Sequence, residues 1–570
     1  MMFATIMGLL LSVGGGFRAE VAAAAASPIL SRGSADVTAD GLPTVQINGI
    51  IWTQVVVGNT VYAGGTFDAA RPAGNAEGEN AVRRTNLLAF DIRTGELIGR
   101  FAPNINGTVR TLAVSPDKKT LYIGGAFTRV NGEKRLRFAA LSVGSGALKS
   151  MSPAFDNQVR TILPTSATVY VGGAFRKVGS TVRSRLAALN AKNGKLRSWK
   201  PVVNGDVLAS TLAPDQKSIV IGGSFSTIGR TKACGMSRLS RGTGAVLPWS
   251  INTVVKNCGK GTAILSLTSD SSRVYGTGFN YHGKGNYEGV FAATGDGRVA
   301  WLQACRGDTY DVAVSRGRVY SVGHAHNCAD IGGFPDASPL QYYRALAVTT
   351  AATGTVGNSV KGSGPFKGKP SPSLINWFPD LRPGNVTGLT QSAWSVVASG
   401  PYVVLGGEFT AVNGVPQQGL VRMIAGAGAP RAEGPLGVTA SEFDPDLALN
   451  EDRSVVVSWK TAWDRDDQVL TYVVLRDNVE IARFVEASWF WRRKALSMRD
   501  QGVQPGLMHK WRIRVVDADG NGVTSSYTRL VIPPAESPSP LPVQPSPSSS
   551  VQPRPEATPV PTGTLALPGS

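Results

Sequence analysis

Acidic residues and histidines are scarce in this chain of 570 residues. It has 39 Asp and Glu against 58 Lys and Arg, only 4 His, and a formal net charge of +19. The basic residues are scattered and form no long Lys/Arg block, whereas nucleic-acid-binding proteins usually concentrate charge on one element. The charge therefore predicts an anionic partner, such as an acidic glycan or a wall polymer, and argues against nucleic acid.

Several signatures of catalysis and nucleotide binding are also absent. The glycine pairs of the chain follow strand-like runs but open no helix, which argues against a phosphate-binding loop. No G-x-S-x-G pattern stands in a strand–helix context. Glycoside hydrolysis needs two carboxylates about 5 to 10 Å apart, and no segment carries a distinctive pair. We expect no cofactor and no catalytic residue, although carboxylates from distant segments could still meet in the fold.

Apolar runs long enough to span a bilayer are missing. The longest, residues 3–17, is glycine-rich and too short, and Ala24-Ala25-Ala26 before Ser27 offers a small-residue cleavage site. No Lys or Arg precedes the run, which departs from the usual signal pattern. We expect residues 1–26 to be a signal peptide, with the mature protein extracellular or associated with the cell wall and without a membrane span.

Cysteine is rare, and its number is even. The four residues are Cys234, Cys258, Cys305 and Cys328. In an exported chain they predict two disulfides. Three connectivities are possible, and pairing of nearest neighbours, Cys234 with Cys258 and Cys305 with Cys328, is the one we favour.

Glycine, in contrast, is abundant and repeats with a period. Strand-like runs end in a glycine pair or its remnant seven times: VYAGGTF, LYIGGAF, VYVGGAF, IVIGGSF, VYGTGFN, VYSVGHA and VVLGGEF. The second glycine position falls at Gly65, Gly125, Gly173, Gly223, Gly278, Gly323 and Gly407. Intervals of 60, 48, 50, 55, 45 and 84 residues indicate a repeat architecture with a period near fifty.

One repeat, residues 107–155, contains four strand-like runs separated by tight turns. They begin at Val109, Leu121, Phe138 and Leu148. Short antiparallel strands repeated in this way are typical of propeller blades. The second run is apolar on both sides, as expected for a strand covered on both faces. The aromatics that follow the glycine pairs are expected to pack between blades; they are Phe67, Phe127, Phe175, Phe225 and Phe409.

The two ends of the repeat region complement each other. The seventh copy ends after a third run near residues 420–424, and the segment before the first copy, about residues 37–46, aligns with the segment that leads into the second. We therefore predict that the N-terminal segment completes the last sheet and closes a seven-bladed propeller over residues 37–426, without a long free edge. Residues 355–385 read as an insertion rich in Gly, Pro and Ser, and long loops of this kind are often functional.

These motifs, VYxGGxF, LAALNxxxGxL and Trp-x-Pro endings, resemble the delta-60-type propeller repeats of secreted actinobacterial proteins over residues 37–426. The segment CRGDTYDVAVSRGRVYSVGHAHNCADIGGFP, from Cys305, is especially similar. The resemblance implies a propeller on a large exported surface protein and supplies no catalytic residues.

Residues 435–532 resemble a fibronectin type III domain. Trp459 stands in SVVVSWKTAWD, and KWRIRVVDADGNGV is similar to the late strand and turn of that sandwich. His509 and Trp511 occupy positions where two tyrosines are common, which puts the usual tyrosine-corner hydrogen bond in question. From residue 533 the chain is rich in Pro and Ser, and residues 533–570 are expected to be a disordered tail.

The densest polar cluster lies in the sixth copy. Its candidate ligand-binding residues are Asp308, Tyr310, Asp311, His324 and His326, framed by Cys305 and Cys328. His324 and His326 have strand spacing, which puts both rings on one face, and zinc is an alternative to a ligand surface. A disulfide-tied loop whose polar groups satisfy one another is the plainest interpretation, and we expect no metal.

Together these features predict an all-β protein: a seven-bladed β-propeller, a fibronectin type III sandwich and a disordered tail. The function that we favour is an exported, monomeric, non-catalytic protein that binds an anionic glycan, a cell-wall polymer or a protein ligand through propeller loops. The alternative is an extracellular carbohydrate-active enzyme. A cluster of carboxylates at one mouth of the propeller would favour the enzyme.

Overall fold

A computed structural model describes residues 36–357, 364–426, 428–430 and 432–535 of the chain. The expected signal peptide and nearly all of the expected tail lie outside these residues. Regular structure in the described part is almost entirely β. The helical segments are η1 Ser250–Thr253, η2 Ala329–Ile331, η3 Gly364–Phe366 and α1 Ala440–Phe443. None of the described helices has the length and apolar character needed to cross a membrane.

Seven sheets within residues 50–424, the first unit of the structure, share one construction, in which three strands pair antiparallel in chain order. The first strands are β2 Ile50–Val57, β7 Val109–Val114, β12 Val159–Pro164, β17 Val207–Leu212, β23 Thr262–Ser269, β27 Thr309–Ser315 and β33 Ala393–Ser399. The second strands are β3 Thr60–Thr66, β8 Thr120–Gly125, β13 Thr168–Gly173, β18 Ser218–Gly223, β24 Arg273–Asn280, β28 Arg318–Ala325 and β34 Tyr402–Gly407. The third strands are β6 Leu87–Asp91, β11 Phe138–Ser142, β16 Leu186–Asn190, β21 Met236–Ser240, β25 Gly289–Thr294, β29 Tyr343–Thr349 and β37 Leu420–Ile424.

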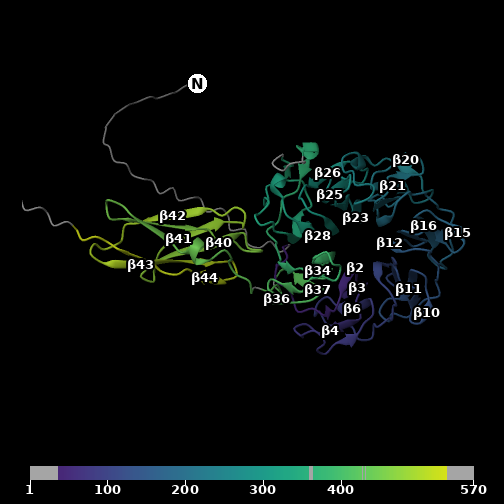
Figure 1. Ribbon diagram of the computed structural model, residues 1–570, viewed down its shortest axis with the longest axis horizontal. Helices are drawn as coiled ribbons and strands as arrows, with labels where there is room; N and C mark the ends of the chain where they lie inside the picture. The colour runs from purple at the N-terminus through teal and green to yellow at the C-terminus, as the bar shows by residue number, and fades with distance from the viewer. Residues whose placement is uncertain (1–35, 358–363, 427, 431, 536–570) are drawn as a thin grey trace, which may run out of the picture.

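The first strands contact one another in succession from β2 to β33, and β33 in turn contacts β2. The sheets thus surround a central axis as a β-propeller, and Figure 1 shows β34 and β37 beside β2 and β3, where the two ends of this unit meet. The segment before β2 pairs with the last sheet through two bridges, Val37 with Ala425 and Leu42 with Arg422. The predicted contact between the N-terminal segment and the last sheet is therefore present.

The glycine pairs are explained by two close approaches. A Cβ on the second glycine, Gly125, would lie 2.1 Å from the carbonyl oxygen of Thr108. A Cβ on Gly65 or Gly173 would lie equally close to the equivalent carbonyl oxygen of its own sheet, at 1.9 Å from Ile50 and 2.2 Å from Gln158. A Cβ on the first glycine of the pair, Gly124, would lie 2.5 Å from Cγ1 of Val159 in the next sheet. The pair therefore allows close strand contact within a sheet and between sheets.

The last sheet also packs against the first sheet through the first glycine of its pair. A Cβ on Gly406 would lie 2.7 Å from Cγ2 of Ile51 on β2. The five phenylalanines that follow the glycine pairs are at most 5% exposed, as predicted from the repeat: Phe67, Phe127, Phe175, Phe225 and Phe409. Burying such rings supplies about 1.5–3 kcal/mol each relative to exposure.

The predicted fourth strand is shorter than expected. Two of the seven sheets have it, as β22 Val246–Leu247 and β26 Val299–Gln303. In the sheet of β11 the segment from Leu148 forms only one bridge, to Leu141. Pro153 follows a few residues later, and a proline cannot donate to a ladder.

Short hairpins occupy many of the loops between second and third strands. They include β9 Arg129–Val130 with β10 Glu133–Lys134, β14 Lys177–Val178 with β15 Thr181–Val182, and β19 Thr227–Ile228 with β20 Thr231–Lys232. Similar small sheets join β1 Gln46–Ile47 to β4 Ala69–Arg71 and β5 Val82–Arg83, β30 Gly354–Thr355 to β31 Pro370–Ser371, and β32 Leu381–Arg382 to β35 Ala411–Val412 and β36 Val415–Pro416.

The second unit consists of two antiparallel sheets around one core. One sheet holds β38 Asp446–Leu449, β39 Val455–Lys460 and β42 Ala495–Asp500, and the other holds β40 Val469–Arg476, β41 Val479–Ala487, β43 Met508–Val516, β44 Gly522–Thr524 and β45 Thr528–Val531. Trp459, Tyr472 and Trp511 are buried between them. His509 accepts a hydrogen bond at Nε2 from the backbone N–H of Gln504 (3.0 Å). The imidazole thus bonds to the backbone five residues upstream, at the position where a tyrosine-corner hydrogen bond was in question.

Candidate binding site at the mouth of the central channel

Every first strand of the propeller is interrupted by a β-bulge near its start. The pairing of β7 with β8, for example, skips from Val109 to Thr111 and leaves Arg110 as the extra residue. Bulges of this kind turn a side chain out of the regular alternation of the strand. The extra residues, in chain order, are Trp52, Arg110, Arg160, Leu208, Leu265 with Ser266, Tyr310 and Trp394. All of them line one cavity of about 480 Å³ on the propeller axis.

Three of these residues form an aromatic row on neighbouring strands. Tyr310 on β27 stacks on Trp394 of β33, with ring centroids 4.1 Å apart and planes 22° apart. Trp394 contacts Trp52 of β2, with centroids 4.9 Å apart. Apart from Tyr310, which is 8% exposed, the rings are only half-buried. The row therefore places three aromatic rings in contact along one side of the cavity.

Two arginines continue the row. The guanidinium carbon of Arg110 lies 3.8 Å from the ring centroid of Trp52, a cation–π contact. Arg160 stands at the same position on the next strand, β12. Burial lowers the pKa of Arg110 to about 10, with the neighbouring charge of Arg160 adding to the effect, and burial also lowers the pKa of Arg160. Both guanidinium groups remain charged at neutral pH.

Neither arginine has a carboxylate partner in ion-pair contact within the described part of the chain. The Nε atoms of Arg110 and Arg160 are buried, and neither has a hydrogen-bond partner among the described residues. The carboxylate of Asp206 acts on Arg160 from a distance and raises its pKa against the effect of burial. Two adjacent, partly desolvated guanidinium groups next to aromatic rings favour an anion in the cavity.

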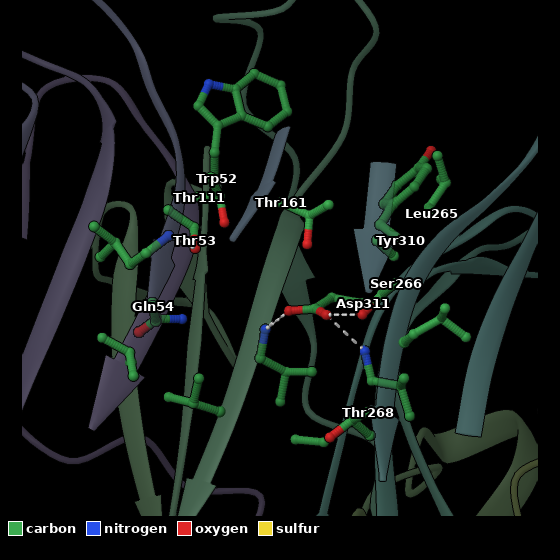
Figure 2. Close-up of a pocket in the computed structure, with 18 of the residues that line it drawn as sticks. Trp52, Thr53, Gln54, Thr111, Thr161, Leu265, Ser266, Thr268, Tyr310 and Asp311 are labelled. Carbon is green, nitrogen blue, oxygen red and sulfur yellow. Dashed lines mark hydrogen bonds between the residues drawn. The ribbon is translucent and has the colours of Figure 1, made fainter. Parts of the chain in front are cut away.

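Asp311 lies deeper in the channel and joins three sheets. Its carboxylate accepts hydrogen bonds from Ser266 Oγ (2.5 Å), the backbone N–H of Val396 (2.9 Å) and its own neighbour Val312 N–H (2.9 Å), as Figure 2 shows. Burial raises its pKa to about 6 despite these donors. Its oxygens are thus engaged with the protein, and the side chain stabilises the contact between β23, β27 and β33.

Hydroxyl and amide groups line the rest of the channel. Thr161 and Ser210 bond through their hydroxyls at 2.7 Å, and Gln54 Nε2 donates to Ser395 Oγ at 3.2 Å. Thr53 Oγ1 accepts from the backbone N–H of Leu112 at 3.2 Å. These bonds run between neighbouring sheets and consolidate the ring below its mouth.

Of the residues predicted for the site, Tyr310 and Asp311 line the cavity, and His324 and Asp308 lie behind Tyr310. The Tyr310 hydroxyl is 2.9 Å from His324 Nδ1, and the backbone N–H of Asp308 donates to His324 Nε2 at 3.3 Å. Since Nε2 accepts, Nδ1 carries the proton and donates to Tyr310. Burial, with Arg344 adding to it, lowers the pKa of His324 to about 4, so the ring is neutral and both nitrogens are engaged.

Asp308 is the second carboxyl group of this region. Burial raises its pKa to about 6, while the N–H of Asn280, which donates to it at 3.0 Å, acts in the opposite direction. His326 lies outside the cavity lining, where its Nδ1 is 2.6 Å from Asp336 Oδ1. The two histidines of the zinc alternative thus have separate partners.

The predicted disulfides are confirmed. Cys234 pairs with Cys258 and Cys305 with Cys328, which is the nearest-neighbour connectivity. The second bridge fixes the loop before β27 to the loop after β28, and it thereby supports the strand that carries Tyr310 and Asp311.

Trp52, Arg110, Arg160 and Trp394 were missed by reasoning from the sequence. The signal was present in the repeats as the second residue of a four-residue segment near the start of each first strand: IWTQ, VRTL, VRTI, VLAS, ILSL, TYDV and AWSV. Aligning the copies on these strands, instead of on the glycine pairs, places the bulge residues in one column.

Comparison with known proteins adds little to this geometry. No family model and no curated protein matches the chain, so the resemblance to delta-60-type repeats stays a prediction. Among solved structures, the WD40 β-propeller domain of Doa1 is similar at 12% identity and a TM-score of 0.37, over 68% of this chain and 97% of that one. The GH74 enzyme of Niastella koreensis is similar at 12% identity and a TM-score of 0.37, over 85% of this chain and 73% of that one.

Proposed function

We propose that this protein is an exported, non-catalytic binding protein whose channel mouth takes an anionic glycan or cell-wall polymer. The observation that carries the proposal is the continuous arc of Tyr310, Trp394, Trp52, Arg110 and Arg160 around one cavity. Aromatic faces receive the apolar faces of sugar rings, and the arginines receive a carboxylate or phosphate. The formal charge of +19 would favour the approach of such a polymer.

We also propose a seven-bladed propeller followed by a fibronectin type III domain as the scaffold. The seven similar sheets, the cyclic contacts of their first strands and the packing of Gly406 against Ile51 support a closed ring of seven. The two sheets around Trp459 and the corner bond of His509 support a type III domain. The two disulfides are compatible with an extracellular protein.

An extracellular glycosidase is the second candidate, because two carboxyl groups near the channel, Asp308 and Asp311, have a pKa raised to about 6. The site argues against it in two respects. Asp311 is the only carboxylate among the described residues that line the cavity. Its oxygens already accept bonds from Ser266, Val312 and Val396, whereas a glycosidase needs two carboxyl groups free to flank the scissile bond.

The test is binding of the full chain to acidic polymers, polygalacturonate and teichoic acid, and to a neutral glucan at several salt concentrations. We expect selective binding of at least one acidic polymer, at least tenfold weaker in the double variant Arg110→Ala/Arg160→Ala, because each charge-assisted hydrogen bond contributes about 1.5–3 kcal/mol. The matched control is Lys177→Ala/Lys232→Ala, which removes the same charge from two exposed positions on outer hairpins.

An equal loss in both double variants would show that net charge, and not the channel mouth, determines binding. Release of reducing ends from polygalacturonate or from the neutral glucan, abolished by Asp311→Asn, would instead establish the glycosidase. A protein ligand would be indicated by retention of a wall protein on the wild-type chain and its loss in the arginine variant.

A further inference from the structure

A second cavity opens where the propeller meets the second unit. Its volume is about 600 Å³, within the range of ligand sites. Five aromatic side chains line it: Tyr342, Tyr343, Phe378, Trp463 and Phe490. The first three belong to the propeller and the other two to the second unit, so neither unit forms this cavity alone. We call it the junction crevice.

Contacts across the junction crevice hold its two walls in place. Tyr343 of the propeller stacks on Phe490 of the second unit, with ring centroids 4.7 Å apart and planes 24° apart. Phe490 also contacts Phe378, with centroids 5.2 Å apart. The backbone N–H of Phe378 donates to the Arg465 carbonyl at 3.0 Å. A ligand would therefore enter a preformed site without first ordering its walls.

The junction crevice lies on the same face of the propeller as the channel mouth. Tyr343 pairs with Ala325, where β28 ends and β29 begins. The bulge at Tyr310 interrupts the pairing of β27 with this same end of β28. Tyr310 is on the first strand of the sheet and Tyr343 on the third. The crevice therefore lies outward from the channel mouth, along a single sheet.

Tyr342 lies between the two cavities. Its ring is 5.5 Å from that of His324, measured between centroids, and the other side of His324 faces the Tyr310 hydroxyl at the mouth. His326 lies 6.0 Å from Tyr342, and the guanidinium carbon of Arg344 lies 5.1 Å from it. Tyr342 is 45% exposed. Part of its ring is therefore available to a ligand that passes from one cavity to the other.

Arg344 brings a positive charge to this path. Its Nη1 donates to Gln391 Oε1 at 2.6 Å and its Nη2 to the Thr390 carbonyl at 3.4 Å, and both of these acceptors are uncharged. Burial lowers its pKa, while Asp380 and Glu408 act against burial from a distance, without ion-pair contact. The guanidinium group stays charged at neutral pH and retains N–H groups for a further acceptor.

The other two arginines that line the junction crevice are already paired. Arg465 Nε is 2.8 Å from Glu433 Oε2, and Arg493 Nη1 is 2.9 Å from Glu442 Oε1. Arg344 has no such carboxylate among the described residues. It is therefore the arginine of the crevice with capacity for an acidic group of a ligand.

We propose that the acidic glycan bound at the channel mouth continues past Tyr342 into the junction crevice, so that the protein holds an extended stretch of the polymer. This inference rests on the proposed function, because the occupant is the same polymer. The groups of the crevice suit it: Tyr342 and Trp463 offer aromatic faces to sugar rings, Arg344 binds an acidic group, and Asp380 accepts from hydroxyls.

The test compares long chains with short fragments by calorimetric titration of the full protein. The probes are polygalacturonate and teichoic acid, each as the polymer and as a fragment of three repeat units. For the polymer that binds, we expect the long chain to bind about tenfold more tightly than its fragment. Tyr342→Ala should weaken the long chain about fivefold and leave the fragment within about twofold of wild type.

The matched control is Tyr281→Ala, which removes a tyrosine that is 67% exposed and lines neither cavity. This variant should bind the long chain as the wild type does. Hydroxyl-radical footprinting of the wild type gives a measurement that needs no variant. The long chain should protect Tyr342 and Trp463 from oxidation, and the fragment should not.

The outcomes separate this inference from the proposed function. Equal binding of the long chain by wild type and Tyr342→Ala, without protection of Tyr342, would overturn the inference alone, provided that Arg110→Ala/Arg160→Ala still weakens the fragment. A fragment weakened as much as the long chain would place Tyr342 at the mouth and would also overturn it. Failure of every acidic polymer to bind the wild type would overturn both.

Discussion

Tyr310 and Trp394 stack at the channel mouth with centroids 4.1 Å apart, although they lie on different sheets. Their contact depends on the ring faces, while the Tyr310 hydroxyl is turned to His324. We therefore expect Tyr310→Phe to leave polymer binding within about twofold of wild type. Tyr310→Ala should weaken it about tenfold, since an aromatic pair contributes about 0.5–1.5 kcal/mol beyond its buried area.

Tryptophan fluorescence during polymer titration measures both variants. A large loss of affinity in Tyr310→Phe would contradict this account and would assign the hydroxyl, or its bond to His324, a direct part in binding. Trp459→Phe, in the core of the second unit, provides a control for fluorescence changes that do not originate at the mouth.

Replacing the second glycine of a pair is expected to lower the stability of the protein. In Gly125→Ala the new Cβ would lie 2.1 Å from the Thr108 carbonyl oxygen, so the backbone must shift. We expect the free energy of unfolding to fall by about 2 kcal/mol or more, in the range of overpacked cores, as measured by urea denaturation. Gly99→Ala is the matched control, because a methyl group added at that residue would have no neighbouring atom within 4 Å; a similar loss there would refute the steric explanation.

The raised pKa of Asp311 should make the free energy of unfolding depend on pH. Its pKa is about 6 in the folded protein and lower when unfolded, so the folded state binds the proton more tightly. The stabilisation is complete below about pH 4 and is lost as the pH rises through 6. The free energy of unfolding of wild type minus that of Asp311→Asn should therefore fall by about 2 kcal/mol between pH 4 and pH 7.

Urea unfolding of both proteins at four pH values measures this difference, and Asp308, which titrates in the same range, is common to both. A difference that is independent of pH, or that grows as the pH rises, would show that Asp311 is not the group responsible.

The bridge between Cys305 and Cys328 supports the strand that carries the site. Its sequence separation is 23 residues, and closing a loop of that length stabilises by roughly 3 kcal/mol in the chain-entropy model. Cys305→Ser/Cys328→Ser should lower the free energy of unfolding by about that amount and weaken polymer binding. Cys234→Ser/Cys258→Ser, with a separation of 24 residues, should lower stability equally but leave the affinity of the folded protein near wild type; identical losses of affinity would contradict a local role for the first bridge.

Much of the fold could be predicted because it repeats. The runs beginning at Val109 and Phe138 start and end where β7 and β11 do. The nearest-neighbour cysteine pairing, favoured among three possibilities, is confirmed. The fourth run, at Leu148, is shorter than predicted: it forms one bridge, to Leu141, and Pro153, which cannot donate to a ladder, follows it. Signal peptide, domain limits and family resemblance stay predictions.

The site was only partly predictable, for a physical reason. Tyr310 and Asp311 stood in a visibly polar segment, whereas Trp52 and Trp394 are ordinary aromatics on strands at opposite ends of the propeller sequence. Nothing local distinguishes them from core residues, and the bulge that turns them into the channel is a property of strand pairing.

The sequence by itself determined the repeated strands, because turn chemistry and apolar runs act over a few dozen residues at most. It favoured the pairing of neighbouring cysteines without excluding the other two connectivities. The glycine pairs could also be recognised in the sequence as a repeat, although the close contacts that require them appear only in the packed sheets. Only the tertiary structure decided that Trp52, Arg110, Arg160, Tyr310 and Trp394 share one cavity and that Tyr342 lies between this cavity and a second one at the junction of the two units. Ring closure brings together side chains that are distant along the chain, and burial then changes their charge and hydrogen-bonding demands.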